Sequence, residues 1–140
     1  MFISKSCIFI GGALSLLMFL FHTRLYTLLG WKNELSKISD ISRKIIYTIN
    51  LALLLIFLIF GFISFIYVNE LAKCEGLAFG ICLGYSLFWL WRGIWQVTYF
   101  KLPKNTQVNK KGLGIYYSLV TSFTILFIVY LVPVLIVIIK

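Results

Sequence analysis

Four long apolar runs dominate the pattern of hydrophobic and polar positions along this chain. They cover approximately residues 3–22, 45–68, 76–99 and 113–139. A helix rises about 1.5 Å per residue, so a run of about 20 apolar residues is long enough to cross the hydrocarbon core of a bilayer. The pattern therefore predicts an all-α integral membrane protein, a four-helix bundle in which residues 1–140 form a single transmembrane domain.

Most basic residues lie in the connections between these runs, and they predict how the chain is oriented. They are Arg24, Lys32, Lys37, Arg43 and Lys44 in the first connection, and Lys101, Lys104, Lys110 and Lys111 in the third. The second connection holds only Lys73, beside Glu70 and Glu75. Because connections rich in Lys and Arg stay on the cytoplasmic side, we expect both basic connections inside and both termini outside.

The first connection also has a weak helical pattern of its own. Leu35, Ile38 and Ile41 recur three residues apart, with polar residues between them. This spacing predicts a short helix that lies on the membrane surface. A plain polar loop with a few apolar anchors is the alternative.

Composition agrees with a membrane protein and removes one other interpretation. Hydrophobic residues make up 61% of the chain and charged residues only 12%, whereas soluble domains carry about 25% charged residues. The net charge of +9 is explained by the connections, which attract anionic lipid. We therefore expect membrane lipid as a partner and no nucleic acid, and we expect the plasma (inner) membrane of a bacterium, where small four-span proteins are common.

Glycines repeat along the third run. Gly76, Gly80 and Gly84 form a GxxxGxxxG series, which places three small residues on one narrow face of a helix. Such a face lets another helix backbone approach closely. We expect it to pack against another helix of the same chain, and a second copy of the chain is the alternative.

A second stripe runs along another face of the same helix. Its members, separated by steps of four, three, four and three residues, are Tyr85, Trp89, Arg92, Gln96 and Tyr99. An arginine that faces lipid at this depth costs a few kcal/mol on insertion scales, about 2.5–3.5 at the centre of a span. Arg92 therefore faces the bundle interior, or its side chain reaches the cytoplasmic headgroups; the sequence leaves both open.

Polar residues of the other runs fall at the same height as Arg92. His22 ends the first run, Tyr47 and Asn50 lie near the start of the second, and Tyr117, Ser118 and Thr121 near the start of the fourth. The hypothesis is a pocket in the cytoplasmic half that contains Arg92, Gln96, Trp89, Asn50, Tyr47 and His22, with Arg92 holding an anion or a carbonyl group. A set of ordinary hydrogen bonds between helices is the alternative.

Several kinds of chemistry lack the residues they need. No Asp or Glu lies within an apolar run, which argues against a proton-coupled pump and against a Ser/His/Asp catalytic set. His22 is the single histidine, so we expect no metal site and no bound cofactor. Cys7 and Cys74 both fall near the outer face, where they would be free thiols or, as the alternative, a disulfide between the first and third runs.

Three functions remain open. We expect a structural or accessory subunit that binds a membrane partner or a lipid, because the chain has minimal connections and no catalytic constellation. An oligomeric channel or small-solute carrier is the first alternative, and it requires a homo-oligomer packed through Gly76, Gly80 and Gly84. The second alternative is an intramembrane protein or enzyme that binds a lipid or quinone on the Arg92 face.

Overall fold

The computed structural model describes residues 1–28, 35–100 and 110–139. It is a bundle of helices, and no strand occurs in these residues. The helices are α1 (Phe2–Leu28), α3 (Asp40–Ile66), α4 (Val68–Lys73), α5 (Leu77–Thr98) and α6 (Lys110–Ile139). Four of them contain segments long and apolar enough to cross a membrane: Phe2–Arg24, Asp40–Ile66, Leu77–Thr98 and Gly112–Ile139. The predicted all-α four-helix bundle is confirmed.

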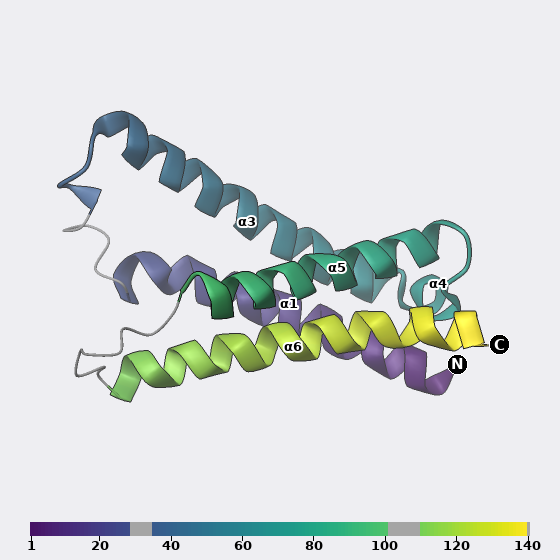
Figure 1. The fold of residues 1–140 in the computed structure, drawn as a ribbon. Coiled ribbons are helices and arrows are strands. Elements are labelled where there is room, and N and C mark those ends of the chain that lie inside the picture. Colours follow the sequence, from purple (N-terminus) through teal and green to yellow (C-terminus); the bar gives the residue numbers. More distant parts are fainter. Residues whose placement is uncertain (29–34, 101–109, 140) are drawn as a thin grey trace.

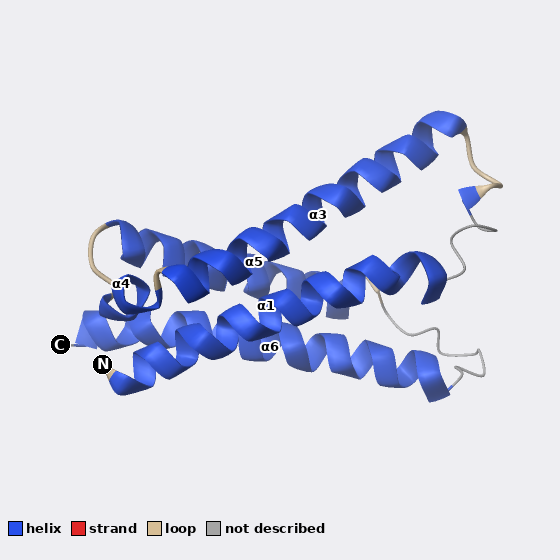
Figure 2. Cartoon of the chain, turned by 180° about the vertical axis from the view of Figure 1, so that it is seen from behind, coloured by secondary structure: helices blue, strands red, loops and turns tan. Residues whose placement is uncertain are grey.

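Figure 1 shows how the four long helices are arranged. Helices α5 and α6 lie side by side, and α1 packs against both α3 and α6. Toward its N-terminal end, α3 leans away from the other helices, and the view from behind shows the same divergence (Figure 2). Both chain termini lie at the end of the bundle that holds α4. The ends of α1 and α5 and the starts of α3 and α6 lie at the opposite end.

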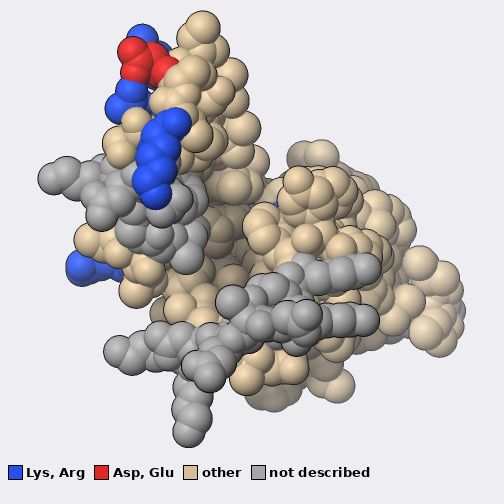
Figure 3. Space-filling view, turned by 60° about the vertical axis from the view of Figure 1, so that its left-hand side comes forward, with Lys and Arg blue, Asp and Glu red and all other residues tan. Residues whose placement is uncertain are grey.

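The surface of the bundle is almost entirely uncharged between its ends. Figure 3 looks toward the end where α3 begins, and Lys and Arg side chains gather around the first turns of that helix, next to Asp40. In the same view the surface is hollowed between α3 and the rest of the bundle. An apolar surface of this extent is covered by lipid in a membrane protein.

Helix α3 begins earlier than the predicted apolar run. Ser39 adopts an extended conformation and caps the helix by accepting a hydrogen bond from the backbone N–H of Ser42, and Asp40 in the first turn forms an ion pair with Arg43. This capped start separates Ile41 from Leu35 by a turn. One helix therefore does not run through Leu35, Ile38 and Ile41: Leu35 is helical, and a turn and a bend follow it before Ser39. Residues 29–34 of that connection lie outside the described residues, so the short surface helix stays a prediction.

Small residues let α1 and α3 approach closely. A Cβ added to Gly12 would lie 2.9 Å from Cβ of Ser64, and one added to Gly61 would lie 2.5 Å from a methyl carbon of Leu16. Beside this contact the Tyr130 hydroxyl of α6 lies 2.7 Å from the Ser64 hydroxyl and 3.5 Å from that of Ser15. Three helices are thus joined by small residues and hydrogen bonds in the half of the bundle that holds α4.

Aromatic rings fill the centre of the bundle. Trp89 of α5 is fully buried and stacks between Phe57 of α3, at 5.3 Å between ring centroids, and Phe123 of α6, at 5.7 Å. These three rings, which we call the aromatic layer, connect three of the four long helices across the core. Large buried aromatic side chains contribute strongly to packing, about 0.5–1.5 kcal/mol for each ring pair beyond the area buried.

The glycine face of α5 was expected to contact another helix of the chain, but it lies on the outside of the bundle. A Cβ added to Gly80 or Gly84 would meet no atom within 4 Å, so within the described residues no helix packs on this face. Gly76 precedes α5 and has a φ of 52°, the left-handed region that the turn after Cys74 requires. The predicted packing of these glycines against another helix of the same chain is therefore wrong, because the aromatic face of α5 fills the interior instead.

Candidate functional site

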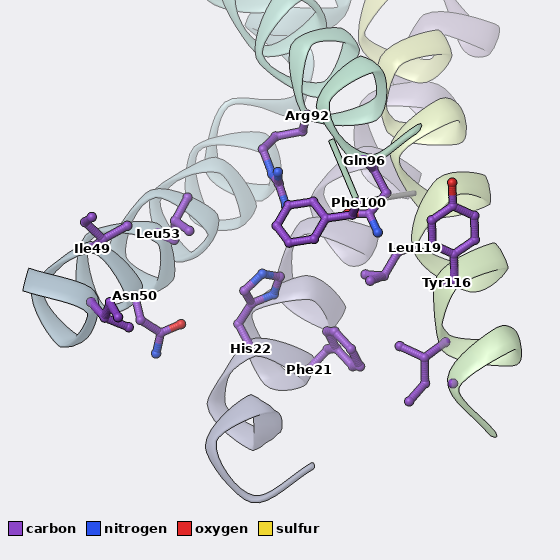
Figure 4. Close-up of a pocket in the computed structure, with 13 residues that line it drawn as sticks. Phe21, His22, Ile49, Asn50, Leu53, Arg92, Gln96, Phe100, Tyr116 and Leu119 are labelled. Atoms are coloured by element: carbon purple, nitrogen blue, oxygen red, sulfur yellow. The ribbon is translucent and has the colours of Figure 1, made fainter. Parts of the chain in front are cut away.

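A cavity of about 460 Å³ lies between the four long helices at the end that carries the basic connections. This volume falls within the range of small-molecule sites, about 300–1,000 Å³. Figure 4 shows Arg92 and Gln96 reaching into it from α5, His22 and Phe21 from α1, and Asn50 from α3. The cavity is lined by Phe21, His22, Ile46, Ile49, Asn50, Leu53, Arg92, Gln96, Phe100, Gly112, Ile115, Tyr116 and Leu119.

The cavity exists because α3 leans away from α5 and α6 at this end. Two of its polar side chains contact the aromatic layer: the Arg92 guanidinium lies over the Phe123 ring, 5.0 Å from the centroid, and the His22 ring meets Phe57 edge to face at 4.7 Å. The two polar groups therefore stand on the aromatic rings that close the core. Aliphatic side chains of α3 and α6 form the walls on either side.

The Arg92 side chain lies in the interior of the bundle and does not reach toward the headgroups. Its side chain is half-buried and lines the cavity, and its Nε is buried without a hydrogen-bond partner among the described residues. Arg92 lies six residues before the end of α5 at Thr98, which places it about 9 Å along the axis from that end. A guanidinium offers five N–H donors and no acceptor, so its natural partner is an anion.

No acidic side chain of the described residues balances this charge. Asp40 pairs with Arg43 at the start of α3, and Glu70 and Glu75 line a separate cavity at the far end of the bundle, between α3, α4 and α5. The cation–π contact with Phe123 gives partial compensation, about 0.5–2 kcal/mol. Arg92 is thus a positive charge in a mostly apolar cavity.

His22 is held in one orientation by its own helix. Its ring is buried, and Nδ1 lies 2.9 Å from the backbone carbonyl oxygen of Met18. A carbonyl oxygen only accepts, so Nδ1 carries the proton and donates it. In the neutral ring Nε2 is then a hydrogen-bond acceptor. His22 and Arg92 are close enough to interact electrostatically.

The structure brings four of the six predicted pocket residues to one cavity: Arg92, Gln96, Asn50 and His22. The other two are not among its lining residues: Trp89 belongs to the aromatic layer, and Tyr47 is 39% exposed. Helix α3 meets the cavity with Ile46, Ile49, Asn50 and Leu53.

The contribution of α6 differs from the one expected. Tyr117, Ser118 and Thr121 are exposed, whereas Tyr116 and Leu119 line the cavity. Adjacent residues of a helix point about 100° apart, so the orientation of α6 about its own axis decides which of the two tyrosines faces the cavity. Phe21 and Phe100 were missed as well, because single aromatic residues at the ends of apolar runs also fit the headgroup region.

The cysteines show no bridge between α1 and the start of α5. Cys7, Cys74 and Cys82 are all free. The Cys74 thiol lies beside the Cys82 thiol, and burial raises the pKa of Cys74 above its ordinary value. The neighbour of Cys74 is thus Cys82 and not Cys7. Within the described residues no group of three or more His, Cys, Asp or Glu side chains is placed to hold a metal ion.

Comparison of the chain with models of protein families, with curated proteins and with solved structures gave no match.

Proposed function

We propose that this membrane protein binds a lipid with an anionic head group in the cavity that Arg92 lines. The observation that carries the proposal is the position of Arg92: a permanent cation on the wall of a mostly apolar cavity, with no acidic partner among the described residues. This makes the chain a structural or accessory subunit whose membrane partner is lipid. We further propose the plasma (inner) membrane of a bacterium as its location, with both basic connections on the cytoplasmic side.

The physical argument begins with the cost of an unpaired charge. An arginine within a span costs up to about 2.5–3.5 kcal/mol on insertion scales, the value at the centre of the span, and the cation–π contact offsets part of this. A bound anion offsets the rest, because hydrogen bonds to charged groups contribute about 1.5–3 kcal/mol each. The aliphatic walls then favour a ligand whose anion is attached to hydrocarbon.

The cavity also suits lipid by its position. It lies at the end of the bundle where the helices meet the headgroup region, and it is hollowed between α3 and the rest of the bundle (Figure 3). An acyl chain can therefore enter from the bilayer while the head group stays near Arg92. A water-soluble anion would gain nothing from Ile49, Leu53 or Leu119.

The test compares two lipids and two arginines. Native mass spectrometry of the purified protein in mild detergent measures retained dioleoyl phosphatidylglycerol, which is anionic, and dioleoyl phosphatidylcholine, which has the same chains and no net charge. The wild type should retain the anionic lipid at least about tenfold better, since tenfold corresponds to about 1.4 kcal/mol. Arg92→Gln should abolish this preference.

Arg24→Gln is the matched control, because Arg24 is an exposed cation near the same end of the bundle. This variant should keep the preference. If both substitutions reduce it equally, the attraction is a general effect of surface charge and the proposal fails. A wild type that retains both lipids equally would also contradict it.

The channel alternative receives less support. The core of the single chain is filled across the aromatic layer by Phe57, Trp89 and Phe123, so a path would have to run between copies. The open face at Gly80 and Gly84 is where a second copy would pack. A monomer in native mass spectrometry that still binds the anionic lipid would favour the lipid-binding function over the channel.

A further inference from the structure

The cavity holds a second polar group whose hydrogen-bond polarity is fixed. From it we infer that the preferred head group is a phosphate monoester, a phosphate joined to the lipid through one oxygen and free to carry a proton. This inference rests on the lipid-binding function proposed above and narrows its ligand. Three properties of the cavity lead to it: the number of positive charges, the acceptor atom of His22, and the apolar walls.

The charge of the cavity favours a head group that carries one negative charge there. Among the lining residues that the structure describes, Arg92 is the cation, and Gln96 and Asn50 are neutral. A single negative charge on the ligand balances Arg92, while a second charge would need a second positive charge nearby. Zwitterionic head groups bring a cation toward Arg92 and are disfavoured by repulsion.

His22 then distinguishes between kinds of anion. Its Nδ1–H donates to the Met18 carbonyl oxygen at 2.9 Å, so the Nε2 of a neutral ring can only accept a hydrogen bond. A carboxylate or a phosphate diester satisfies Arg92 but has no hydrogen to donate to Nε2. A phosphate monoester supplies both groups, because its monoanion has charged oxygens for Arg92 and a P–O–H for Nε2.

The monoester is preferred over the diester whether the shared proton sits on the phosphate or on Nε2. If it moves from the phosphate to Nε2, the ligand becomes a dianion and His22 a cation, and the total charge of the site is unchanged. A diester has no such proton, so it cannot donate a hydrogen bond to Nε2.

The walls separate a lipid from a soluble phosphate. Ile46, Ile49 and Leu53 of α3 face Ile115 and Leu119 of α6 across the cavity. Burying these side chains against an acyl chain is favourable because it removes apolar surface from water, whereas inorganic phosphate has no apolar surface to offer them. The inferred ligand is therefore a lipid that ends in a phosphate monoester.

A matched pair of lipids tests the inference. Dioleoyl phosphatidic acid ends in a phosphate monoester, and dioleoyl phosphatidylmethanol is the same molecule with that phosphate closed by one methyl group. Binding of each to the purified protein in mild detergent is measured by native mass spectrometry titration at pH 7, with inorganic phosphate as a competitor. We expect phosphatidic acid to bind at least about tenfold more tightly, since one charge-assisted hydrogen bond is lost with the methyl ester.

Two substitutions of His22 assign the difference to Nε2. His22→Phe keeps a ring against Phe57 but removes the acceptor, and it should reduce the preference to about twofold or less. His22→Gln keeps an acceptor oxygen and should retain most of the preference. Arg24→Gln, outside the cavity, should leave it unchanged. A monodisperse peak in size-exclusion chromatography confirms that each variant is folded.

The outcomes separate this inference from the function on which it rests. If the two lipids bind equally and both lose affinity in Arg92→Gln, the monoester inference is overturned and the lipid-binding function stands. If neither lipid responds to Arg92→Gln, both fail. If inorganic phosphate displaces phosphatidic acid at equal concentration, the site takes soluble phosphate and the lipid assignment is overturned.

Discussion

The contact between α1 and α3 gives a sharp quantitative prediction for Gly12→Ala. The added Cβ would lie 2.9 Å from Cβ of Ser64 and 3.4 Å from the carbonyl oxygen of Gly61. Ordinary contacts between carbon atoms are about 3.5–4.0 Å. Cβ of Ser64 is attached directly to the α3 backbone, so no rotamer change moves it away. The two helices must separate locally by about 0.6–1 Å.

The cost follows from the contacts that such a separation opens. The dispersion energy of one pair of atoms in contact is about 0.1–0.2 kcal/mol. A gap of about 0.5–1 Å removes about a quarter to a half of that energy for each pair. If about 20 pairs along this contact are affected, the loss is about 1 kcal/mol. Overpacking in cores costs about 1–3 kcal/mol. We expect Gly12→Ala to lower the free energy of unfolding by an amount in that range.

Gly80→Ala is the matched control, because it is the same chemical change within a helix and its Cβ meets nothing within 4 Å. Unfolding by sodium dodecyl sulfate in mixed micelles, followed by tryptophan fluorescence, gives the free energy for each variant. Gly80→Ala should be neutral or slightly stabilising. Equal stability of Gly12→Ala and wild type would refute the packing of α1 on α3, and equal destabilisation by both substitutions would refute the assignment of the open and closed faces.

Three further predictions concern other parts of the molecule. Tyr130→Phe removes the hydroxyl 2.7 Å from Ser64 and should lower the free energy of unfolding by about 0.6–2 kcal/mol in the same assay; no change would show that the hydrogen bond contributes nothing. In a variant with Cys7 and Cys82 replaced by serine, maleimide should label Cys74 slowly at pH 7 and faster as pH rises, because burial raises the pKa of its thiol and the thiolate is the reactive form. Labelling at the rate of an exposed cysteine would contradict this. A reporter enzyme fused after Lys140 should be active on the outer side of the membrane, and activity in the cytoplasm would overturn the predicted orientation.

The sequence predicted the helices well because hydrophobic length is a local property. Each of the four apolar runs became a helix, and the boundaries moved by a few residues where capping decides them. At α3, for example, Ser39 and Asp40 start the helix ahead of the apolar run. Such a cap depends on one serine and the conformation of its backbone, which hydropathy does not report.

The candidate site was predictable only in part. Arg92 and Gln96 share a face of α5 by helical spacing, and Asn50 and His22 lie at the matching height. Which face of α5 turns inward was not predictable, because small glycines and large aromatic residues both suit a helix interface. The structure puts Trp89 inside and Gly80 outside, since large rings fill a space that opposed glycines would leave empty.

The sequence also could not predict how α6 is rotated or where α1 contacts α3, because several residues of each helix suit an interface equally well. Helix α6 is apolar on nearly every side, so nothing in it distinguishes Tyr116 from Tyr117 as the inward residue. Gly12 and Gly61 each have a small residue three positions later, Ser15 and Ser64. That signal is common in membrane helices, and only the assembled bundle shows which small residues meet.

The most direct test of lipid binding at Arg92 is a photocrosslinking measurement in bilayers. The protein is placed in nanodiscs with a phosphatidic acid that carries a diazirine near the head of one acyl chain, and the labelled residues are mapped by mass spectrometry after irradiation. Binding in the cavity predicts labels on Ile49, Leu53, Ile115 and Leu119 that disappear in Arg92→Gln. Labels confined to outward-facing residues such as Leu55 and Leu135, unchanged by that substitution, would contradict it.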